Sequence, residues 1–393
     1  MAVAHATRTS IRTQHFPESV IREMTRIALD VGAINLSQGY PDFAAPQSIK
    51  EAAMRAIQED WNQYSVTWGL RALREAIAEH YRRRYEMDVD PEREVVVCCG
   101  ATESMLAAML GVINPGDEVI IFEPYYESYI PNCFITESKP RFVSLRPTAD
   151  GQWVFDPAEL RRAFNERTKA IIINTPHNPT GKVFTREELQ VIADLCIAHD
   201  VIAITDEIYE FITYDGARHI PIATLPGMAE RTITISGMSK TFSVTGWRLG
   251  YAVAPADLMT GIRKAHDFMS ACAATPLQVA AITMMNLGDA YYQQLRTEYA
   301  QRRAFALEML REAGFKPVEP QGAYYIMADF SAISTEDDMT FGLRMAKQIG
   351  VACVPGSPFF SRPESSRSVV RFAFCKKLET LAQARERLRR LRS

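Results

Sequence analysis

Short runs of apolar residues alternate with helical or turn segments through the middle of the chain. The runs lie at 94–99, 118–122, 141–145, 170–174, 201–205 and 232–235. A strand that is apolar at successive positions is covered on both faces, which is typical of a parallel sheet between layers of helices. The alternation therefore predicts an α/β fold, with a large domain built on a mainly parallel central sheet flanked by helices.

After Asp257 the pattern changes. Helical segments at 277–287 and 290–314 precede short strand-like runs at 323–328, 351–354 and 369–374, and a closing helix begins at Leu378. These elements predict a smaller α+β domain, which we expect the N-terminal segment to complete. The expected division is residues 1–45 for the N-terminal segment, 46–288 for the large domain and 289–393 for the small domain.

Composition excludes several classes of protein. The 393 residues carry a net charge of −3 with both signs mixed along the chain, which argues against a nucleic-acid-binding surface. No apolar run approaches 20 residues, so no membrane span is expected. The seven cysteines form no Cys-x-x-Cys pair, so neither a metal site nor a disulfide framework is indicated. We expect a cytoplasmic protein with a loosely ordered N-terminus.

One lysine stands in a loop between two apolar strands. Lys240 lies in the small-residue stretch 236–250, between strand-like runs at 232–235 and 251–254. The plain interpretation is a surface lysine, but a lysine is rarely buried without a role. One such role is covalent attachment to an aldehyde cofactor. Arg248, eight residues on, could then bind a phosphate with its fork of donors.

Polar residues also follow the other strands. Asp206 closes the run 201–205, where it could cap a helix or keep a pyridinium nitrogen protonated. Ligands of parallel sheets collect at the carboxyl ends of the strands, where Gly100, Asn178 and Lys240 are also expected. Arg371 interrupts the apolar strand 369–374, either as a structural ion pair or as a clamp for a substrate carboxylate.

Three further segments have both a structural and a functional interpretation. The amides of 100–102 open a helix and could bind phosphate, as many strand-to-helix turns could. Tyr125 and Tyr126 could stack on a planar ring or pack in the core. The sequence 180–183 is not a phosphate loop, because the upstream glycine is missing and Val183 replaces the Ser or Thr that would bind magnesium.

Taken together, these residues resemble the signature of fold-type-I aminotransferases of class I/II, which depend on pyridoxal phosphate. The matching positions are Gly39, Tyr64, Gly100, Ala101, Thr102, Tyr125, His177, Asn178, Pro179, Asp206, Tyr209, Lys240, Arg248 and Arg371. They occur in the family's order and approximate spacing over nearly the whole chain. Through 35–43, 62–64 and 174–181 the chain is most similar to the kynurenine/glutamine/methionine aminotransferase branch.

The resemblance implies roles for these residues around pyridoxal 5'-phosphate. Lys240 would hold the cofactor covalently and move the substrate proton, and Asp206 would pair with the ring nitrogen. Asn178 and Tyr209 would hold the ring oxygen, and Tyr125 would stack on the ring. The phosphate would be bound by the residues Ala101, Thr102, Ser239, Arg248 and, from a second subunit of a homodimer, Tyr64. The substrate would contact Gly39, Tyr40, Asn178 and Arg371.

The implied reaction is a ping-pong transfer of an amino group from an L-amino acid to a 2-oxo acid. No second cation for an acidic side chain can be located in the sequence, which favours neutral, aromatic or sulfur-containing substrates such as methionine, glutamine, phenylalanine or kynurenine. A cysteine-conjugate β-lyase, or an aminotransferase for aspartate or diaminopimelate, stays open as an alternative. A non-catalytic regulator would need an added DNA-binding domain, for which the chain has no spare length.

Three positions depart from the family pattern. Gly237 stands where many relatives have a phosphate-binding serine, for which Ser236 or Ser239 could compensate. Glu18 stands where kynurenine-type enzymes often have tryptophan. Ala273 and Ala274 replace aromatic or histidine residues, so a pocket for large aromatic substrates is less well supported.

Overall fold

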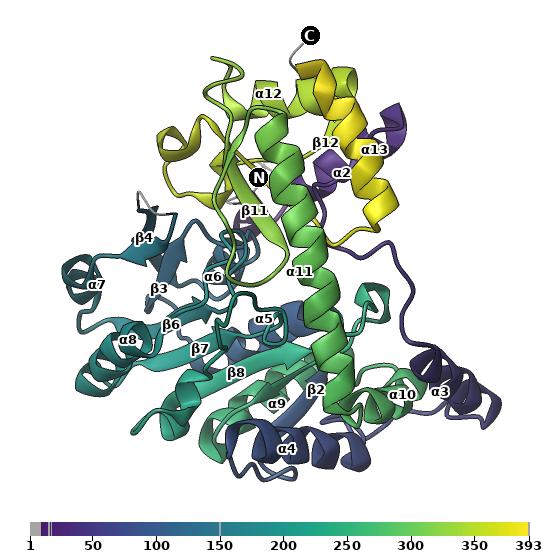
Figure 1. Cartoon of the computed structure of the whole chain (residues 1–393). Coiled ribbons are helices and arrows are strands. Elements are labelled where there is room, and N and C mark those ends of the chain that lie inside the picture. Colours follow the sequence, from purple (N-terminus) through teal and green to yellow (C-terminus); the bar gives the residue numbers. More distant parts are fainter. Residues whose placement is uncertain (1–8, 15, 17, 149–150, 392–393) are drawn as a thin grey trace, which may run out of the picture.

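A large sheet forms the centre of the computed structural model, which describes residues 9–14, 16, 18–148 and 151–391 (Figure 1). Its strand order is β2-β9-β8-β7-β6-β3-β4-β5. The bounds are β2 Val95–Cys98, β3 Glu118–Glu123, β4 Lys139–Pro147, β5 Trp153–Phe155, β6 Thr168–Asn174, β7 Ile202–Asp206, β8 Thr232–Gly237 and β9 Gly250–Val253. The pairs from β8 across to β4 are parallel, and β9, β2 and β5 add antiparallel edges. The predicted mainly parallel sheet is confirmed.

Helices cover both faces of this sheet, because alternate residues of the same strands point to opposite sides. Ile171 and Ile173 of β6 pack with α8 on one face, whereas Ile172 packs with α5 and α9 on the other. The helices of this part are α3 Gln47–Gln58, α4 Arg71–Tyr85, α5 Ala101–Val112, α6 Tyr129–Ile135, α7 Pro157–Ala163, α8 Arg186–His199, α9 Ala256–Ser270 and α10 Thr275–Met285. This two-sided burial explains the unbroken apolar runs of the sequence.

A second, smaller sheet has the order β10-β11-β14-β13 and is antiparallel throughout. Its strands are β10 Lys316–Pro317, β11 Tyr325–Asp329, β13 Val354–Pro355 and β14 Val369–Ala373, with helices α11 Asp289–Glu312, α12 Asp338–Arg344 and α13 Leu378–Leu388. Short 3₁₀ segments lie at 222–224, 229–231, 245–247, 357–359, 363–366 and 389–391, and a π-helical turn at 345–349.

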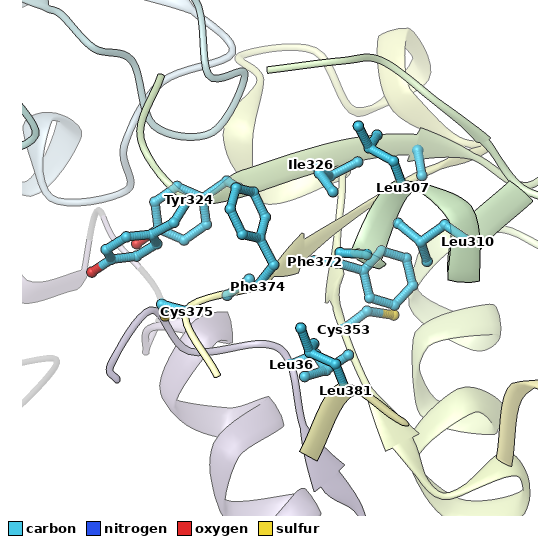
Figure 2. Packing of buried hydrophobic residues seen from close by; sticks show 14 of the residues in the cluster. Leu36, Leu307, Leu310, Tyr324, Ile326, Cys353, Phe372, Phe374, Cys375 and Leu381 are labelled. Carbon is cyan, nitrogen blue, oxygen red and sulfur yellow. The ribbon is translucent and has the colours of Figure 1, made fainter. Parts of the chain in front are cut away.

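The N-terminal segment joins the smaller part, as predicted. It contains α1 Ile11–Gln14, α2 Val20–Val31 and β1 Ile34–Asn35, and β1 pairs in parallel with β12 Val351–Ala352. Figure 2 shows Leu36 in one apolar cluster with Leu310 of α11, Phe372 of β14 and Leu381 of α13. The N-terminal segment is therefore part of the smaller core.

The domain limits at 45/46 and 288/289 stay a prediction. Helix α11 starts at Asp289, and its residues Leu307 and Leu310 pack in the smaller core, which supports a limit near the start of this helix. The sequence did not predict helices α6, α7 and α9 or strands β5 and β10. No helix of the described residues has the length and apolar character needed to cross a membrane.

Candidate active site

The amine of Lys240 lies in a cavity of about 470 Å³ beside the carboxyl ends of β6 and β7. Lys240 follows β8, and its Nζ donates a hydrogen bond to the carbonyl oxygen of Gly39 at 3.1 Å. Burial lowers the pKa of the lysine to about 8, and the charges of Arg248 and Arg371 act in the same direction. With this pKa about one tenth of the amine is neutral at pH 7, far more than for an ordinary lysine, and the neutral amine is the form that a nucleophile or base requires.

The last residue of β7 supplies a buried carboxylate to the same cavity. Asp206 Oδ2 accepts a hydrogen bond from the Tyr129 hydroxyl at 2.8 Å, and Oδ1 accepts from the backbone N–H of Ile208 at 3.4 Å. Burial raises the pKa of Asp206, although these hydrogen bonds and the charge of Lys240 oppose the rise. Tyr209 also lines the cavity, and its hydroxyl lies 2.9 Å from the hydroxyl of Tyr325, another lining residue.

Arg371 of β14 brings a buried cation to the cavity, with only 1% of the residue exposed. Its Nη1 donates to Asn178 Oδ1 at 2.8 Å and its Nη2 donates to the Ser37 carbonyl oxygen at 2.7 Å. Its Nε has no partner among the described residues. Asn178 is fixed in turn, because Asn174 Oδ1 accepts its backbone N–H at 2.7 Å. The guanidinium is therefore held in place and keeps an unused donor.

A third set of donors gathers where α5 begins. Arg248 Nη1 donates to the Thr245 carbonyl oxygen at 3.0 Å. A Cβ on Gly100 would lie 2.5 Å from Arg248 Nη2, so the guanidinium lies directly against the turn into α5. Ala101 and Thr102, the first two residues of this helix, also line the cavity. Free amides at a helix N-terminus beside an arginine are suited to a phosphate.

Comparison with known proteins decides the family. The model of the family "Aminotransferase class I and II" matches residues 31–388. The chain belongs to this aminotransferase family.

Individual relatives carry several substrate names. This aminotransferase is 40% identical to kynurenine–oxoglutarate transaminase 3 of Mus musculus over 402 residues, which cover 95% of the chain and 88% of the relative. It superposes on the structure of N-succinyldiaminopimelate aminotransferase from Mycobacterium tuberculosis with a TM-score of 0.95 and 40% identity, covering 98% and 100% of the two chains. The structure of YbdL of Escherichia coli, described with a methionine aminotransferase function, superposes with a TM-score of 0.92 and 33% identity. The match covers 98% of this chain and 100% of YbdL.

The residues of the cavity fit the cofactor of this family. The aminotransferase is a pyridoxal-phosphate-dependent transaminase. Its cavity offers an amine with a lowered pKa for the aldehyde, a buried carboxylate for the ring nitrogen, and a cation with helix amides for the phosphate. These are three complementary groups around a site large enough for a cofactor and a small substrate.

Most of the predicted site residues meet in this cavity. Those that line it are Gly39, Tyr40, Ala101, Thr102, Asn178, Asp206, Tyr209, Ser239, Lys240, Arg248 and Arg371. Tyr64 does not line the cavity of its own chain, and it is 84% exposed. Its predicted contribution to a second subunit stays a prediction.

Tyr125 is the prediction that the cavity does not support. Its ring stacks on Phe142 with centroids 5.6 Å apart, and the residue is absent from the cavity lining. Tyr126 lines the cavity instead. The turn after β3 sends neighbouring side chains in different directions, which adjacent tyrosines in a sequence do not reveal.

The structure also explains the missing serine at 237. Gly237 pairs with Gly250 across β8 and β9, and a Cβ on Gly237 would lie 2.8 Å from the Gly250 Cα. Ser236 donates its hydroxyl to Glu210 Oε1 at 2.8 Å and does not line the cavity. Ser239 does line it. Of the two candidates, Ser239 is therefore the hydroxyl available to a phosphate.

Sequence reasoning missed several cavity residues. Tyr129, Tyr325 and Arg22 line the cavity from α6, β11 and α2. Tyr129 belongs to a helix that the sequence did not predict. Tyr325 follows another tyrosine, and Arg22 lies on a helix predicted only from its apolar face. No local pattern marks these residues as parts of a site.

One cluster of residue types that can bind metals lies where β2, α5 and α9 meet. Ligand atoms of Cys98, Glu103 and His266 lie within 4.8 Å of one another. His266 Nδ1 is 2.8 Å from Glu103 Oε1, and Nε2 is 2.8 Å from the Thr67 carbonyl oxygen. Both ring nitrogens therefore face acceptors, which favours an imidazolium paired with a carboxylate and leaves no free lone pair for a metal.

Proposed function

We propose that this enzyme transfers an amino group between an L-amino acid and a 2-oxo acid in a ping-pong reaction. The observation that carries the proposal is the convergence of Lys240, Asp206, Arg248 and Arg371 on one cavity, although they come from separate elements of the chain. We propose neutral, aromatic or sulfur-containing donors, because Ile21, Met105 and Tyr126 add apolar surface to the lining.

The assigned roles follow from the donors and acceptors that each residue presents. When bound, pyridoxal phosphate supplies an electron sink that stabilises negative charge at the substrate Cα. Lys240 would attach it and then, as a neutral amine, take the proton from Cα. Asp206, oriented by Tyr129, would hold a proton on the ring nitrogen. Tyr209 and Asn178 would hold the ring oxygen.

The remaining residues would hold the phosphate of the cofactor and the carboxylate of the substrate. Arg248, Ser239 and the amides of Ala101 and Thr102 would bind the phosphate, and Tyr126, which lines the cavity, would stack on the ring in place of Tyr125. Arg371 would bind the substrate carboxylate with its fork of donors. Its unpartnered Nε supports this role, because a buried donor without an acceptor is costly until a ligand satisfies it.

The test of this proposal is Lys240→Ala. We expect it to abolish transamination, because no other amine lines the cavity within the described residues, while pyridoxal phosphate still binds without a covalent bond. Turnover is measured by 2-oxo acid formation and binding by equilibrium dialysis. The matched control is Lys264→Ala, which removes an exposed lysine of α9 and leaves activity intact. Near-normal turnover in the Lys240 variant would refute the assignment.

A panel of donors and acceptors separates the alternatives for the reaction. It pairs methionine, glutamine, phenylalanine, kynurenine, aspartate and diaminopimelate with several 2-oxo acids. Transfer that requires an acceptor supports the transaminase reaction, whereas pyruvate and a free thiol released from a cysteine conjugate without an acceptor identify a β-lyase activity. The same initial proton removal serves both reactions, so only the products distinguish them.

A further inference from the structure

The tyrosine that opens β11 lies between two polar ends of the active-site cavity. Tyr325 lines the cavity and is 3% exposed. Its hydroxyl lies 2.9 Å from the hydroxyl of Tyr209, and its ring faces the guanidinium of Arg371, whose Cζ is 4.3 Å from the ring centroid. The proposed reaction assigns Tyr209 to the ring oxygen of the cofactor and Arg371 to the substrate carboxylate. A side chain that has no assigned role therefore contacts both residues.

The pairing of the small sheet fixes the contact with Arg371. Strands β11 and β14 are antiparallel, with Tyr325 opposite Ala373 and Met327 opposite Arg371. Residues directly opposite share a face of the sheet, and so do residues two apart on one strand. Tyr325 and Arg371 are therefore diagonal neighbours on one face, at a spacing that long side chains can bridge. Because the face of an aromatic ring attracts a cation, Tyr325 supports the guanidinium from within its own sheet.

The contact with Tyr209 joins the two parts of the molecule. Tyr209 belongs to the turn that follows β7 of the large sheet, whereas Tyr325 belongs to the small sheet. A Cβ on Gly39 would overlap the Tyr325 hydroxyl, so this hydroxyl fits only because a glycine stands there. The Tyr325 side chain is thus held at both ends, by its strand and by the narrow space around its hydroxyl.

The two hydroxyls hold two hydrogens, and their contact uses one of them. Burial raises the pKa of both phenols, so each keeps its hydrogen near neutral pH. Neither hydroxyl makes another hydrogen bond with the described residues. When Tyr325 donates, the hydrogen of Tyr209 is left for a further acceptor. An anionic oxygen beside Tyr209 requires a donor, and it therefore selects this direction of the pair.

We propose that Tyr325 is a positioning residue that joins the cofactor end of the site to the carboxylate end. Its hydroxyl donates to Tyr209 and directs the hydrogen of Tyr209 to the ring oxygen, while its ring holds Arg371 in place for the substrate. A hydroxyl that accepts a hydrogen bond becomes a stronger donor, so Tyr325 also strengthens the contact made by Tyr209. This inference rests on the proposed function, from which it takes the roles of Tyr209 and Arg371.

The first test follows the absorbance of the holoenzyme as a function of pH. The absorbance of bound pyridoxal phosphate reports the protonation of the Lys240 nitrogen that holds it. A donor that stabilises negative charge on the ring oxygen weakens the attraction of that oxygen for the proton on the nitrogen, and so lowers the pKa of the nitrogen. We expect Tyr325→Phe, which loses only the hydroxyl, to raise this pKa by about 0.3–0.5, a two- to threefold change in proton affinity.

A double variant shows whether Tyr325 acts through Tyr209. Tyr209→Phe removes the donor to the ring oxygen and should raise the same pKa further. In that background Tyr325→Phe should have no additional effect, because no hydroxyl remains to be directed. An unchanged pKa in Tyr325→Phe, or a shift of the same size with and without the Tyr209 hydroxyl, would overturn the inference.

The matched control is Tyr299→Phe. Tyr299 is a buried tyrosine of α11 whose hydroxyl has no partner among the described residues, and it does not line the cavity. Its variant should leave the pKa of the nitrogen unchanged. A shift as large as that of Tyr325→Phe would mean that the loss of any buried hydroxyl has this effect, which contradicts a specific role for Tyr325.

The affinity for a carboxylate without an amino group tests the other end of the site. 4-Methylpentanoate cannot be transaminated, and its titration into the holoenzyme gives a dissociation constant from the absorbance. We expect Tyr325→Phe, which keeps the ring, to bind it within about twofold of the parent, and Tyr325→Leu to bind it about fivefold more weakly. Equal affinities in the parent and in Tyr325→Leu would show that the ring does not support Arg371.

These measurements separate the inference from the proposed reaction. If the panel of donors and acceptors shows turnover but Tyr325→Phe leaves the pKa unchanged, Tyr325 has no such role and the proposed function stands. If no pair of substrates is turned over but the pKa shifts in Tyr325→Phe and not in the double variant, the proposed reaction fails and the role of Tyr325 toward the cofactor remains.

Discussion

At the scale of single residues, Gly237 shows how packing decides which side chains can serve the cofactor. Its Cβ position is closed by Leu249 O and by Gly250 Cα, both at 2.8 Å. A serine in this place would be closer to backbone atoms than packed proteins allow. A phosphate contact from a side chain at position 237 is therefore not available to this chain, which leaves Ser239.

Gly237→Ser should consequently destabilise the enzyme. We expect a loss of about 1–3 kcal/mol in the free energy of unfolding, typical of overpacking a closed site, and no gain in affinity for pyridoxal phosphate. Urea denaturation and equilibrium dialysis measure the two quantities. Gly288→Ala is the control, because a Cβ there has nothing within 4 Å. A serine variant as stable as the parent would contradict the packing argument.

The sequence alone could predict which residues lie in the cavity where those residues stand at the end of a strand. Asp206 ends β7 and Lys240 follows β8, and chain direction alone brings such residues to one edge of a parallel sheet. Tyr125 was misplaced because the direction of a side chain in a turn depends on local backbone angles. Arg22 was not predicted, because its place in the cavity depends on how α2 packs against a distant part of the chain.

At the scale of elements, α5 and α9 form a closely packed pair behind the cofactor site. Glycines make this possible, since a Cβ on Gly261 would lie 2.4 Å from the Gly111 carbonyl oxygen. A glycine inside a helix lowers intrinsic helix propensity, which is one reason why α9 was not evident in the sequence. The ion pair between Glu103 and His266 joins the same two helices.

This pair gives the enzyme a defined dependence on pH. Burial alone would lower the pKa of His266, but hydrogen bonding to Cys98 and Glu103 outweighs it and raises the pKa to about 10. A folded-state pKa above the unfolded value stabilises the fold at pH below the unfolded value. That stabilisation is present in full below pH ~6.5 and is lost as the pH rises through about 10.

His266→Gln should therefore destabilise the enzyme mainly at low and neutral pH. We expect a loss of about 2 kcal/mol near pH 6, because the half-buried carboxylate of Glu103 loses its charged partner and keeps only Ser270 and the Cys99 amide as donors. The loss should be smaller above pH 10, where the parent also lacks the charge. Urea denaturation of the cofactor-loaded enzyme at both pH values measures this. His199→Gln, on the exposed end of α8, is the control. A loss that is equal at both pH values would exclude the ion-pair explanation.

At the scale of the whole molecule, the two-part architecture was predictable from the change in pattern after Asp257, and so was the return of the N-terminal segment to the smaller core. Short elements such as α6 and α7, of seven residues each, were not. Elements of this length carry too few residues to show a periodicity. Their stability comes from the packing around them, which the sequence does not display.

The loop around Tyr64 indicates how two copies of the chain would assemble. Thr275 Oγ1 donates to the Gln63 carbonyl oxygen at 2.7 Å, and Gln278 Nε2 donates to Ser65 Oγ at 3.0 Å, so α10 fixes this loop. The loop nevertheless exposes apolar and aromatic side chains, and Phe268 of α9 is 92% exposed. Side chains of the loop and α9 that are exposed in this way are Trp61, Tyr64, Val66 and Phe268. Exposed apolar groups of this kind are typical of an interface.

A homodimer in which Tyr64 serves the partner's phosphate site predicts complementation between two defective chains. Lys240→Ala lacks the reacting amine, and Tyr64→Ala would weaken cofactor binding in the opposite site. When the two variants are mixed in equal amounts, unfolded and refolded together, half of the dimers contain one chain of each kind. In each of these hybrid dimers one of the two sites has both groups intact. Activity at limiting pyridoxal phosphate should then recover to about a quarter of the parent value per site, as two-fold symmetry requires.

A mixture of Lys240→Ala with Asp206→Ala is the control. Both defects again lie on separate chains, but Lys240 and Asp206 each serve the cavity of their own chain. Every site of the hybrid therefore lacks one of the two groups, and no activity returns. If the Tyr64 mixture also stays inactive, while Tyr64→Ala alone shows weakened cofactor binding, Tyr64 serves its own chain and the shared site is wrong.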